Sequence, residues 1–233
     1  MGRVIELIST DGFQLDAYLA IPKGKPKGGV VVVQEIFGVN EHIKEVANDY
    51  ALEGYAALAP ALFDRVEKGV ELGYGADDRS RGAGIAFSQL EISTTLQDLT
   101  ASVAQMKTYG RVGIVGYCYG GLMAYLAACN VAELTCAVGY YGGRIVDHLD
   151  QRPKTPLMLH FGERDTHIPM KDVEKIISSK TDIPVFIYDA DHGFNCNHRS
   201  SFNADAAKLA RERTLTFFEQ ELCAKKISTE APS

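Results

Sequence analysis

The fold is decided by residues 113–122, which read GIVGYCYGGL. A short apolar run predicts a strand at 112–115, and a second apolar segment predicts a helix at 122–129. Between them the chain reads glycine, any residue, cysteine, any residue, glycine. A turn this sharp holds its central residue, Cys118, in a strained backbone conformation. Side chains in place of the two flanking glycines would collide with the neighbouring strand and helix, which explains the glycines.

This order of strand, turn and helix is the context of the nucleophile elbow in α/β-hydrolases, with sulfur in place of the serine hydroxyl. The new helix would point its free N–H groups at the Cys118 sulfur, which favours the thiolate. The alternatives are a tight turn around a buried cysteine and a dinucleotide-binding loop. The second alternative needs G-x-G-x-x-G spacing and an acidic ribose partner, and neither is evident. We therefore interpret Cys118 as a nucleophile.

The rest of the chain alternates short apolar runs with amphipathic segments. The alternation indicates an α/β-hydrolase fold with a mostly parallel twisted sheet and helices on both faces. Residues 61–81 show no clear period and are interpreted as an active-site loop with loose helical turns. We expect an N-terminal hairpin over 4–8 and 14–21, strands at 30–33, 55–59, 112–115, 137–141, 156–161 and 185–188, and helices around 43–51 (ended by Gly54), 96–106, 122–129, from Pro169 onward and at 204–222.

Composition limits the class of protein. The chain has 233 residues, 46% of them hydrophobic, so we expect one large core and a single domain over 1–233, with a frayed polar tail at 228–233. The net charge of −6 argues against nucleic acid or an anionic membrane surface as a partner. No apolar run approaches the roughly 20 residues of a membrane span, and the N-terminus lacks the apolar stretch of a signal peptide.

The cysteines indicate the compartment. Their number is odd and no pair has C-x-x-C spacing, so free thiols in a reducing compartment are expected, which favours the cytoplasm. Apart from the nucleophile, most should be small core residues. We expect no cofactor and a monomer, with a dimer left open. The cysteines are Cys118, Cys129, Cys136, Cys196 and Cys223.

The acid and the base follow the nucleophile in α/β-hydrolases, in that order. Asp165 comes just after the strand at 156–161, and His192 comes just after the strand at 185–188. Either residue alone could be an ordinary surface residue. The order of the three, each beyond its own strand, predicts a catalytic triad. The rivals for the base are His160, inside an apolar strand, and His167, beside the acid.

A metal site was considered because His192, Cys196 and His198 lie close together in the sequence. The usual zinc spacings are missing, and a catalytic zinc needs a third well-placed ligand. We therefore expect no metal.

Three blocks of sequence resemble one known family. They are residues 34–40, QEIFGVN, residues 116–121, GYCYGG, and residues 192–194, HGF. The chain is similar over nearly its whole length to the dienelactone hydrolase (carboxymethylenebutenolidase) family, including residues 140–142, YYG, and residues 212–214, ERT. The resemblance implies a hydrolase of small esters or lactones, of the kind used in the degradation of aromatic compounds.

The resemblance also implies roles for single residues. Cys118 would be the nucleophile, His192 the base and Asp165 its orienting acid. The backbone N–H groups of Ile36 and Tyr119 would form the oxyanion hole, where they stabilise charge that develops in the transition state.

Glu35 would sit beside the thiol and help to control its ionisation. Independently of the family, a glutamate at the end of an all-apolar strand is unusual, because buried carboxylates seldom lack a partner. The alternative is a structural ion pair between Glu35 and an arginine such as Arg81.

The pocket departs from the family pattern. Family members that process dienelactone hold the substrate carboxylate with two arginines. Arg81 matches the first by position, with Arg79 as a close competitor. The second position is Cys196 here, although Arg199 is near enough to substitute, and a tyrosine of the pattern is Ile85. We therefore expect the catalytic residues with a changed substrate pocket.

The expected reaction is attack by the Cys118 thiolate on an ester carbonyl, followed by hydrolysis of the thioester. Sulfur suits good leaving groups such as enol esters. Two other functions stay open. One is a cysteine amidase of the glutamine-amidotransferase-like fold, which the late position of His192 argues against. The other is a redox-sensing or binding protein with a reactive thiol and little turnover.

Overall fold

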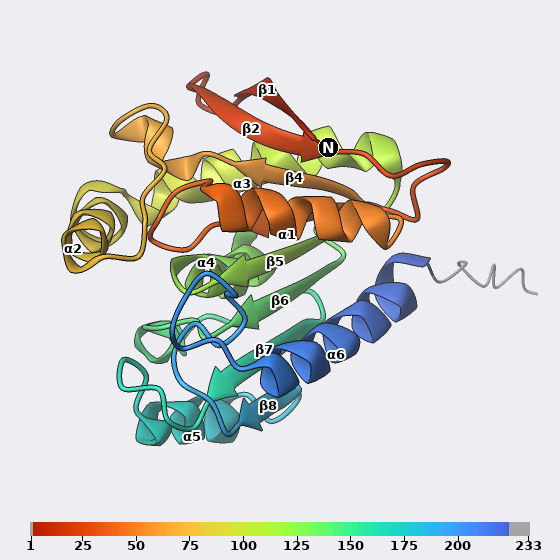
Figure 1. Cartoon of the computed structure of the whole chain (residues 1–233). Helices are drawn as coiled ribbons and strands as arrows, with labels where there is room; N and C mark the ends of the chain where they lie inside the picture. The colour runs from red at the N-terminus through yellow and green to blue at the C-terminus, as the bar shows by residue number, and fades with distance from the viewer. Residues whose placement is uncertain (1, 224–233) are drawn as a thin grey trace, which may run out of the picture.

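The computed structural model describes residues 2–223, in which eight strands form one sheet in the order β1-β2-β4-β3-β5-β6-β7-β8 (Figure 1). The pairings β1–β2 and β2–β4 are antiparallel, and all the others are parallel. The tail predicted at 228–233 lies outside the described residues. The strands are β1 Arg3–Ile8, β2 Gln14–Ala20, β3 Gly29–Val33, β4 Ala56–Pro60, β5 Val112–Tyr117, β6 Cys136–Tyr140, β7 Leu157–Gly162 and β8 Val185–Tyr188.

Helices cover both faces of this sheet (Figure 1). Helices α3 and α4 pack on each other and on the central strands. Helices α1 and α6 lie on the opposite face, where the rings of Tyr50 and Phe218 are 5.9 Å apart. The predicted α/β-hydrolase architecture is thereby confirmed. The helices are α1 Glu41–Leu52, α2 Ala76–Gly84, α3 Ile92–Met106, α4 Tyr119–Asn130, α5 Met170–Ser179 and α6 Ala204–Cys223, with short helical turns at Leu62–Arg65, Ile85–Gln89, Lys107–Tyr109 and Ile145–His148.

The interior strands read as continuous apolar runs because helices cover both of their faces. Every residue of β3, β4, β5, β6 and β7 is buried. The N-terminal hairpin instead has exposed positions in alternation with buried ones. Over residues 2–223, no helix has the length and apolar character that crossing a bilayer requires.

Caps set the ends of the helices that follow the central strands. The Asn40 side chain accepts a hydrogen bond from the Ile43 N–H at the start of α1. Gly54, with φ +94°, stands just beyond its end, as predicted. Helix α4 begins at Tyr119, three residues before the apolar segment that predicted it at 122. The elbow turn leads straight into the helix, which apolar periodicity cannot detect.

The expectation of a loop over 61–81 is wrong in part. The chain forms a short 3-10 turn at Leu62–Arg65 and then α2, which continues as one π-helical turn at Ile85–Gln89. Helix α2 reads ADDRSRGAG and has no apolar stripe, so its period was not detectable. It packs through backbone instead: a Cβ on Gly82 would lie 1.8 Å from the Ile36 carbonyl oxygen.

A buried ion pair ties the 3-10 turn to α3. Arg65 donates through Nε and Nη2 to the two carboxylate oxygens of Asp98, both at 2.8 Å. The Asp98 side chain is fully buried, and that of Arg65 is 11% exposed. Such a bidentate pair satisfies a carboxylate that water cannot reach.

We predict that Arg65→Met lowers the free energy of unfolding by about 3 kcal/mol, because it leaves the Asp98 carboxylate buried without a partner. Urea unfolding at neutral pH measures this. The matched control is Arg81→Met, which breaks the exposed pair of Arg81 with Glu67 and should cost about 0–1 kcal/mol. Equal losses in the two variants would contradict the prediction.

Candidate active site

The elbow stands between β5 and α4. Cys118 has φ 56° and ψ −113°, a strained conformation for a residue with a side chain. Its N–H donates to the Tyr140 carbonyl at 3.0 Å, which holds the turn against β6. A Cβ on Gly116 would lie 1.8 Å from the Gly120 carbonyl oxygen, and a Cβ on Gly120 would lie 2.3 Å from that of Val33. The predicted collisions at both glycines are confirmed.

The structure brings the three predicted triad residues into one hydrogen-bonded chain. Cys118 Sγ lies 3.2 Å from Nε2 of His192, and Nδ1 of His192 lies 2.7 Å from Oδ2 of Asp165. Each residue follows the carboxyl end of its own parallel strand, so the three meet at one edge of the sheet. This is the spacing that proton transfer from the thiol to the ring requires.

Backbone groups fix the acid. The second carboxylate oxygen of Asp165, Oδ1, accepts hydrogen bonds from the N–H groups of His167 at 2.8 Å and Ile168 at 3.0 Å. The Asp165 side chain has no exposed surface, and that of His192 is 9% exposed. The ring of Tyr141 contacts His192 edge-on, with centroids 5.1 Å apart. The imidazole is therefore held in one orientation.

The electrostatics favour a charged imidazole. Burial by itself lowers the pKa of His192, but the negative Cys118 sulfur and the hydrogen bond to Asp165 outweigh it and raise this pKa to about 10. A charged imidazole at this distance stabilises negative charge on a neighbouring sulfur.

The two rival histidines have other places. His160 lies inside β7, where its ring nitrogens form hydrogen bonds with Tyr188 and Thr214. Burial lowers the pKa of His160 to about 3, so it is a neutral core residue. His167 lines the same pocket as Cys118, and its ring centroid is 5.1 Å from that of His192. It lies beside the base and does not contact the sulfur.

The expected oxyanion donors, Ile36 and Tyr119, both line the pocket of Cys118. Tyr119 is the first residue of α4, where backbone N–H groups lack partners within the helix. Ile36 lies on the loop after β3. The buried Gln34 side chain anchors this loop by accepting a hydrogen bond from the Leu62 N–H at 3.2 Å. Both amides thus belong to backbone segments with a defined anchor, the Gln34 hydrogen bond for Ile36 and the start of α4 for Tyr119.

Glu35 has an arginine partner, but it is not Arg81. Its Oε1 lies 3.1 Å from Nη1 of Arg199, and the Glu35 side chain is 1% exposed. Arg81 pairs instead with Glu67 at 2.6 Å on the surface. The guanidinium of Arg199 packs directly against the backbone of Gly193, where a Cβ would lie 2.2 Å from Nη1 of Arg199. This close contact fixes the position of Arg199.

A cavity of about 430 Å³ opens above the Cys118 thiol. Its charged lining is cationic and includes Arg79, Arg144 and Arg199, and no acidic side chain of the described chain lines it. Arg81 is not among the lining residues. Residues two apart on a helix point about 200° away from each other, so only one of Arg79 and Arg81 can face the pocket. The structure therefore places Arg79, the competitor of Arg81 in the sequence, at the pocket, and places Arg81 outside it.

His192, Cys196 and His198, which lie close together in the sequence, do not form a candidate metal group within residues 2–223. His192 forms hydrogen bonds with Asp165 and Cys118, and His198 forms one with Glu45 on the surface. Cys196 is buried and contacts the Tyr74 hydroxyl at 3.3 Å. No pattern in the sequence singles out His42, which the structure places near Cys196 and Glu35.

The sheet order and the elbow define an α/β-hydrolase. The sequence model of the dienelactone hydrolase family matches residues 15–222. The carboxymethylenebutenolidase of Pseudomonas putida is 34% identical over 224 residues, which cover 91% of this chain and 94% of that protein. A Synechocystis protein named as a candidate carboxymethylenebutenolidase is 36% identical over 237 residues, which cover 92% of this chain and 95% of that protein.

A crystal structure from Klebsiella pneumoniae, named as a candidate dienelactone hydrolase, superposes with a TM-score of 0.81 at 29% identity, over 94% of this chain and 99% of that one. The chain therefore belongs to the dienelactone hydrolase family, and it is a hydrolase of esters or lactones.

We predict that Gly82→Ala lowers kcat on the order of 10²-fold, because the new Cβ would displace the backbone of Ile36 and the amide expected in the oxyanion hole. Steady-state hydrolysis of an activated ester measures this. Gly84→Ala is the matched control on the same helix, since nothing lies within 4 Å of its Cβ position. A Gly82→Ala enzyme as active as the control would show that the Ile36 loop tolerates the shift.

We also predict that Cys118→Ala lowers the pKa of His192, because it removes a negative neighbour. The raised pKa stabilises the folded state fully below about pH 6.5, and this contribution disappears as the pH rises through about 10. Side-chain NMR titration of the imidazoles measures the shift, with the buried His160 as an internal reference. An unchanged His192 titration in the variant would contradict the charge pair.

Proposed function

We propose that this enzyme hydrolyses small anionic esters or lactones, enol lactones such as dienelactone among them, through a cysteine nucleophile and a thioester intermediate. One observation carries the proposal. The hydrogen-bonded chain of Cys118, His192 and Asp165 opens into a pocket whose charged lining is cationic. Its relatives named carboxymethylenebutenolidase support the same substrate class.

The reaction has two halves. The Cys118 thiolate attacks the substrate carbonyl, and the oxyanion accepts hydrogen bonds from the amides of Ile36 and Tyr119. The C–O bond then breaks, and the leaving oxygen takes the proton of the His192 imidazolium. The neutral imidazole next removes a proton from water, which attacks the thioester. The acid is released, and the Cys118 thiolate and the imidazolium are restored.

Asp165 keeps the ring in position through both halves. Its carboxylate also stabilises the imidazolium that is present before attack and after turnover.

Two arginines are well placed to hold a substrate carboxylate. Arg79 and Arg199 both line the pocket, so Arg199 supplies the charge missing at Cys196. Because Arg199 also pairs with Glu35, an anionic substrate competes with Glu35 for the same guanidinium. Loss of that pairing would free the Glu35 carboxylate, which the family resemblance places beside the Cys118 thiol. This links binding of an anion to ionisation of the nucleophile.

We place the enzyme in a reducing compartment, the cytoplasm. All five cysteines have free thiols, in agreement with this assignment. A thiol nucleophile also needs protection from oxidation, which a reducing compartment provides.

The test compares hydrolysis of dienelactone with that of a neutral activated ester. We expect Cys118→Ala to lower kcat for both by at least about 10³-fold, because no nucleophile remains. Arg79→Ala should lower kcat/KM for dienelactone by about 10- to 100-fold, the loss expected when one hydrogen bond to a charged group is removed. The same substitution should leave kcat/KM for the neutral ester unchanged. Arg81→Ala is the control, because its guanidinium pairs with Glu67 outside the pocket.

Each contrary outcome has a clear meaning. Turnover by Cys118→Ala near the wild-type rate would disprove the cysteine mechanism. Loss of dienelactone preference in Arg81→Ala rather than Arg79→Ala would restore the original assignment. Rapid alkylation of Cys118 without hydrolysis of either substrate would favour a redox-sensing protein.

A further inference from the structure

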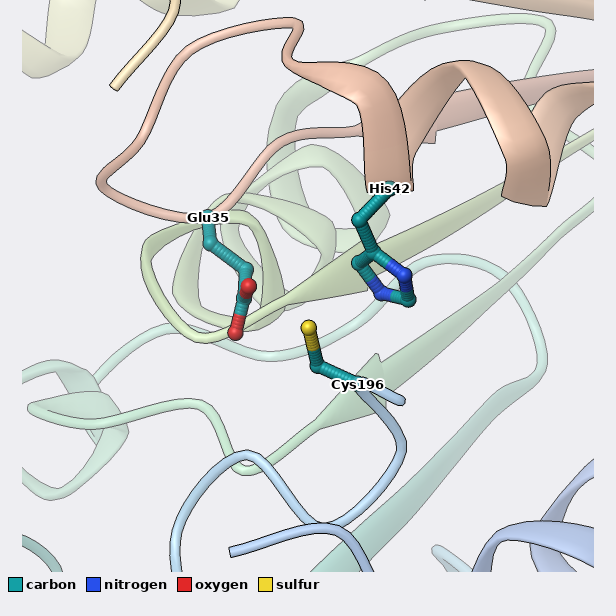
Figure 2. Close-up of side chains that lie close together, drawn as sticks. All are labelled: Glu35, His42 and Cys196. Atoms are coloured by element: carbon teal, nitrogen blue, oxygen red, sulfur yellow. The ribbon is translucent and has the colours of Figure 1, made fainter. Parts of the chain in front are cut away.

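Three buried side chains converge behind the active-site pocket. Glu35 comes from the loop after β3, His42 from the first turn of α1 and Cys196 from the loop before α6. Figure 2 shows the carboxylate, the imidazole and the thiol directed toward a common centre. Their potential ligand atoms all lie within 4.8 Å of one another.

Three polar atoms of this cluster lack partners. Glu35 Oε2 and both ring nitrogens of His42 are buried without any hydrogen bond. The residues are almost fully buried, with exposures of 1% for Glu35, 3% for His42 and 0% for Cys196. A buried polar atom left unpaired costs about 1–3 kcal/mol, so three in one cluster favour a bound ligand at their centre.

We propose that Glu35, His42 and Cys196 bind a zinc ion. One carboxylate oxygen, one imidazole nitrogen and one thiolate are a donor set typical of zinc, which accepts oxygen, nitrogen and sulfur together. Tetrahedral zinc brings such atoms to about 3.3–3.6 Å from one another. The ligand atoms, which lie within 4.8 Å of one another here, would therefore move closer together on binding zinc, through rotation of the side chains.

The charges also balance. The carboxylate of Glu35 and the thiolate of Cys196 together neutralise a divalent ion, and the thiol proton leaves to solvent on binding. Oε1 of Glu35 can keep its ion pair with Arg199, because Oε2 is the atom without a partner. The ion would thereby fix the position of a carboxylate that adjoins the active-site pocket.

A route for the ion leads from the surface. His42 lines a second cavity of about 360 Å³, together with Glu45, Asn197 and Arg211. His42 also groups with Glu45 and His198, whose ligand atoms again lie within 4.8 Å of one another. This outer group is partly exposed, and His198 already forms a hydrogen bond with Glu45. The inner group is the better site because Glu35 Oε2 and the ring nitrogens of His42 are buried without hydrogen bonds.

The test uses untagged full-length protein carrying Cys118→Ala, so that the active-site thiol cannot bind metal. Zinc is titrated in competition with a chromophoric chelator, and cobalt is added separately to detect thiolate-to-cobalt absorption. We expect one bound equivalent and a thiolate–cobalt band. Further substitution of Cys196→Ala should abolish the band, and either Cys196→Ala or His42→Gln should weaken zinc binding at least about 100-fold.

The matched control is Cys129→Ala, a buried cysteine on α4 outside the cluster, which should keep both the affinity and the band. Circular dichroism establishes that each variant is folded. The proposal is overturned if folded protein binds no zinc, or if the cobalt complex lacks the thiolate band. It is also overturned if His198→Gln abolishes binding while Cys196→Ala does not, since that result assigns the ion to the outer group. None of these outcomes depends on hydrolytic activity.

Discussion

The backbone at Cys118 is the constraint on which the rest of the site depends. Strand β5 lies between β3 and β6, and only Cys118 separates its last residue from the first residue of α4. So abrupt a change of direction is possible only because the glycines at 116 and 120 let backbone approach backbone closely. Holding a cysteine at positive φ costs about 1–3 kcal/mol, which the burial of β5 and α4 offsets. In return, the sulfur stands at the edge of the sheet where parallel strands end.

Two networks of polar side chains lie near this sulfur. In the first every buried polar group has a hydrogen-bond partner, and in the second one group has none. The first passes through His192 to Asp165 and ends on backbone N–H groups, so every member has a partner. The second passes from Arg199 to Glu35 and stops at Oε2, which has none. A complete network holds a ring rigidly for proton transfer. An incomplete one leaves a carboxylate that can respond to a substrate anion or to a cation.

The cationic pocket and the acidic chain are compatible because the charges are segregated. The net charge of −6 spreads over the whole molecule, whereas arginines gather around the thiol. A low-dielectric cavity strengthens their effect on an anionic substrate. The replacement of a family arginine at Cys196 therefore does not remove the cationic character, since Arg199 reaches the same cavity from three residues further along.

Much of the molecule was predictable from local sequence. Interior parallel strands are short apolar runs, and glycines and a cysteine marked the elbow. Acid and base followed from the rule that each lies beyond its own strand, since parallel strands end at one edge. The helix α2 was missed because its contacts are made by backbone at Gly82 rather than by an apolar stripe. For a related reason the sequence could not show that Arg79 rather than Arg81 lines the pocket, since packing sets which side of that helix faces it.

The sequence alone determined the order of strands and helices, the elbow and the identity of the three residues that meet there. These depend on local conformation and on the shared edge of a parallel sheet. Only the tertiary structure decided which arginine pairs with Glu35 and that His42 and Cys196 lie beside it. Those side chains come from loops and helices far apart in the chain, and no periodicity relates them. Their contacts are products of how α1 and the loop before α6 pack against the sheet.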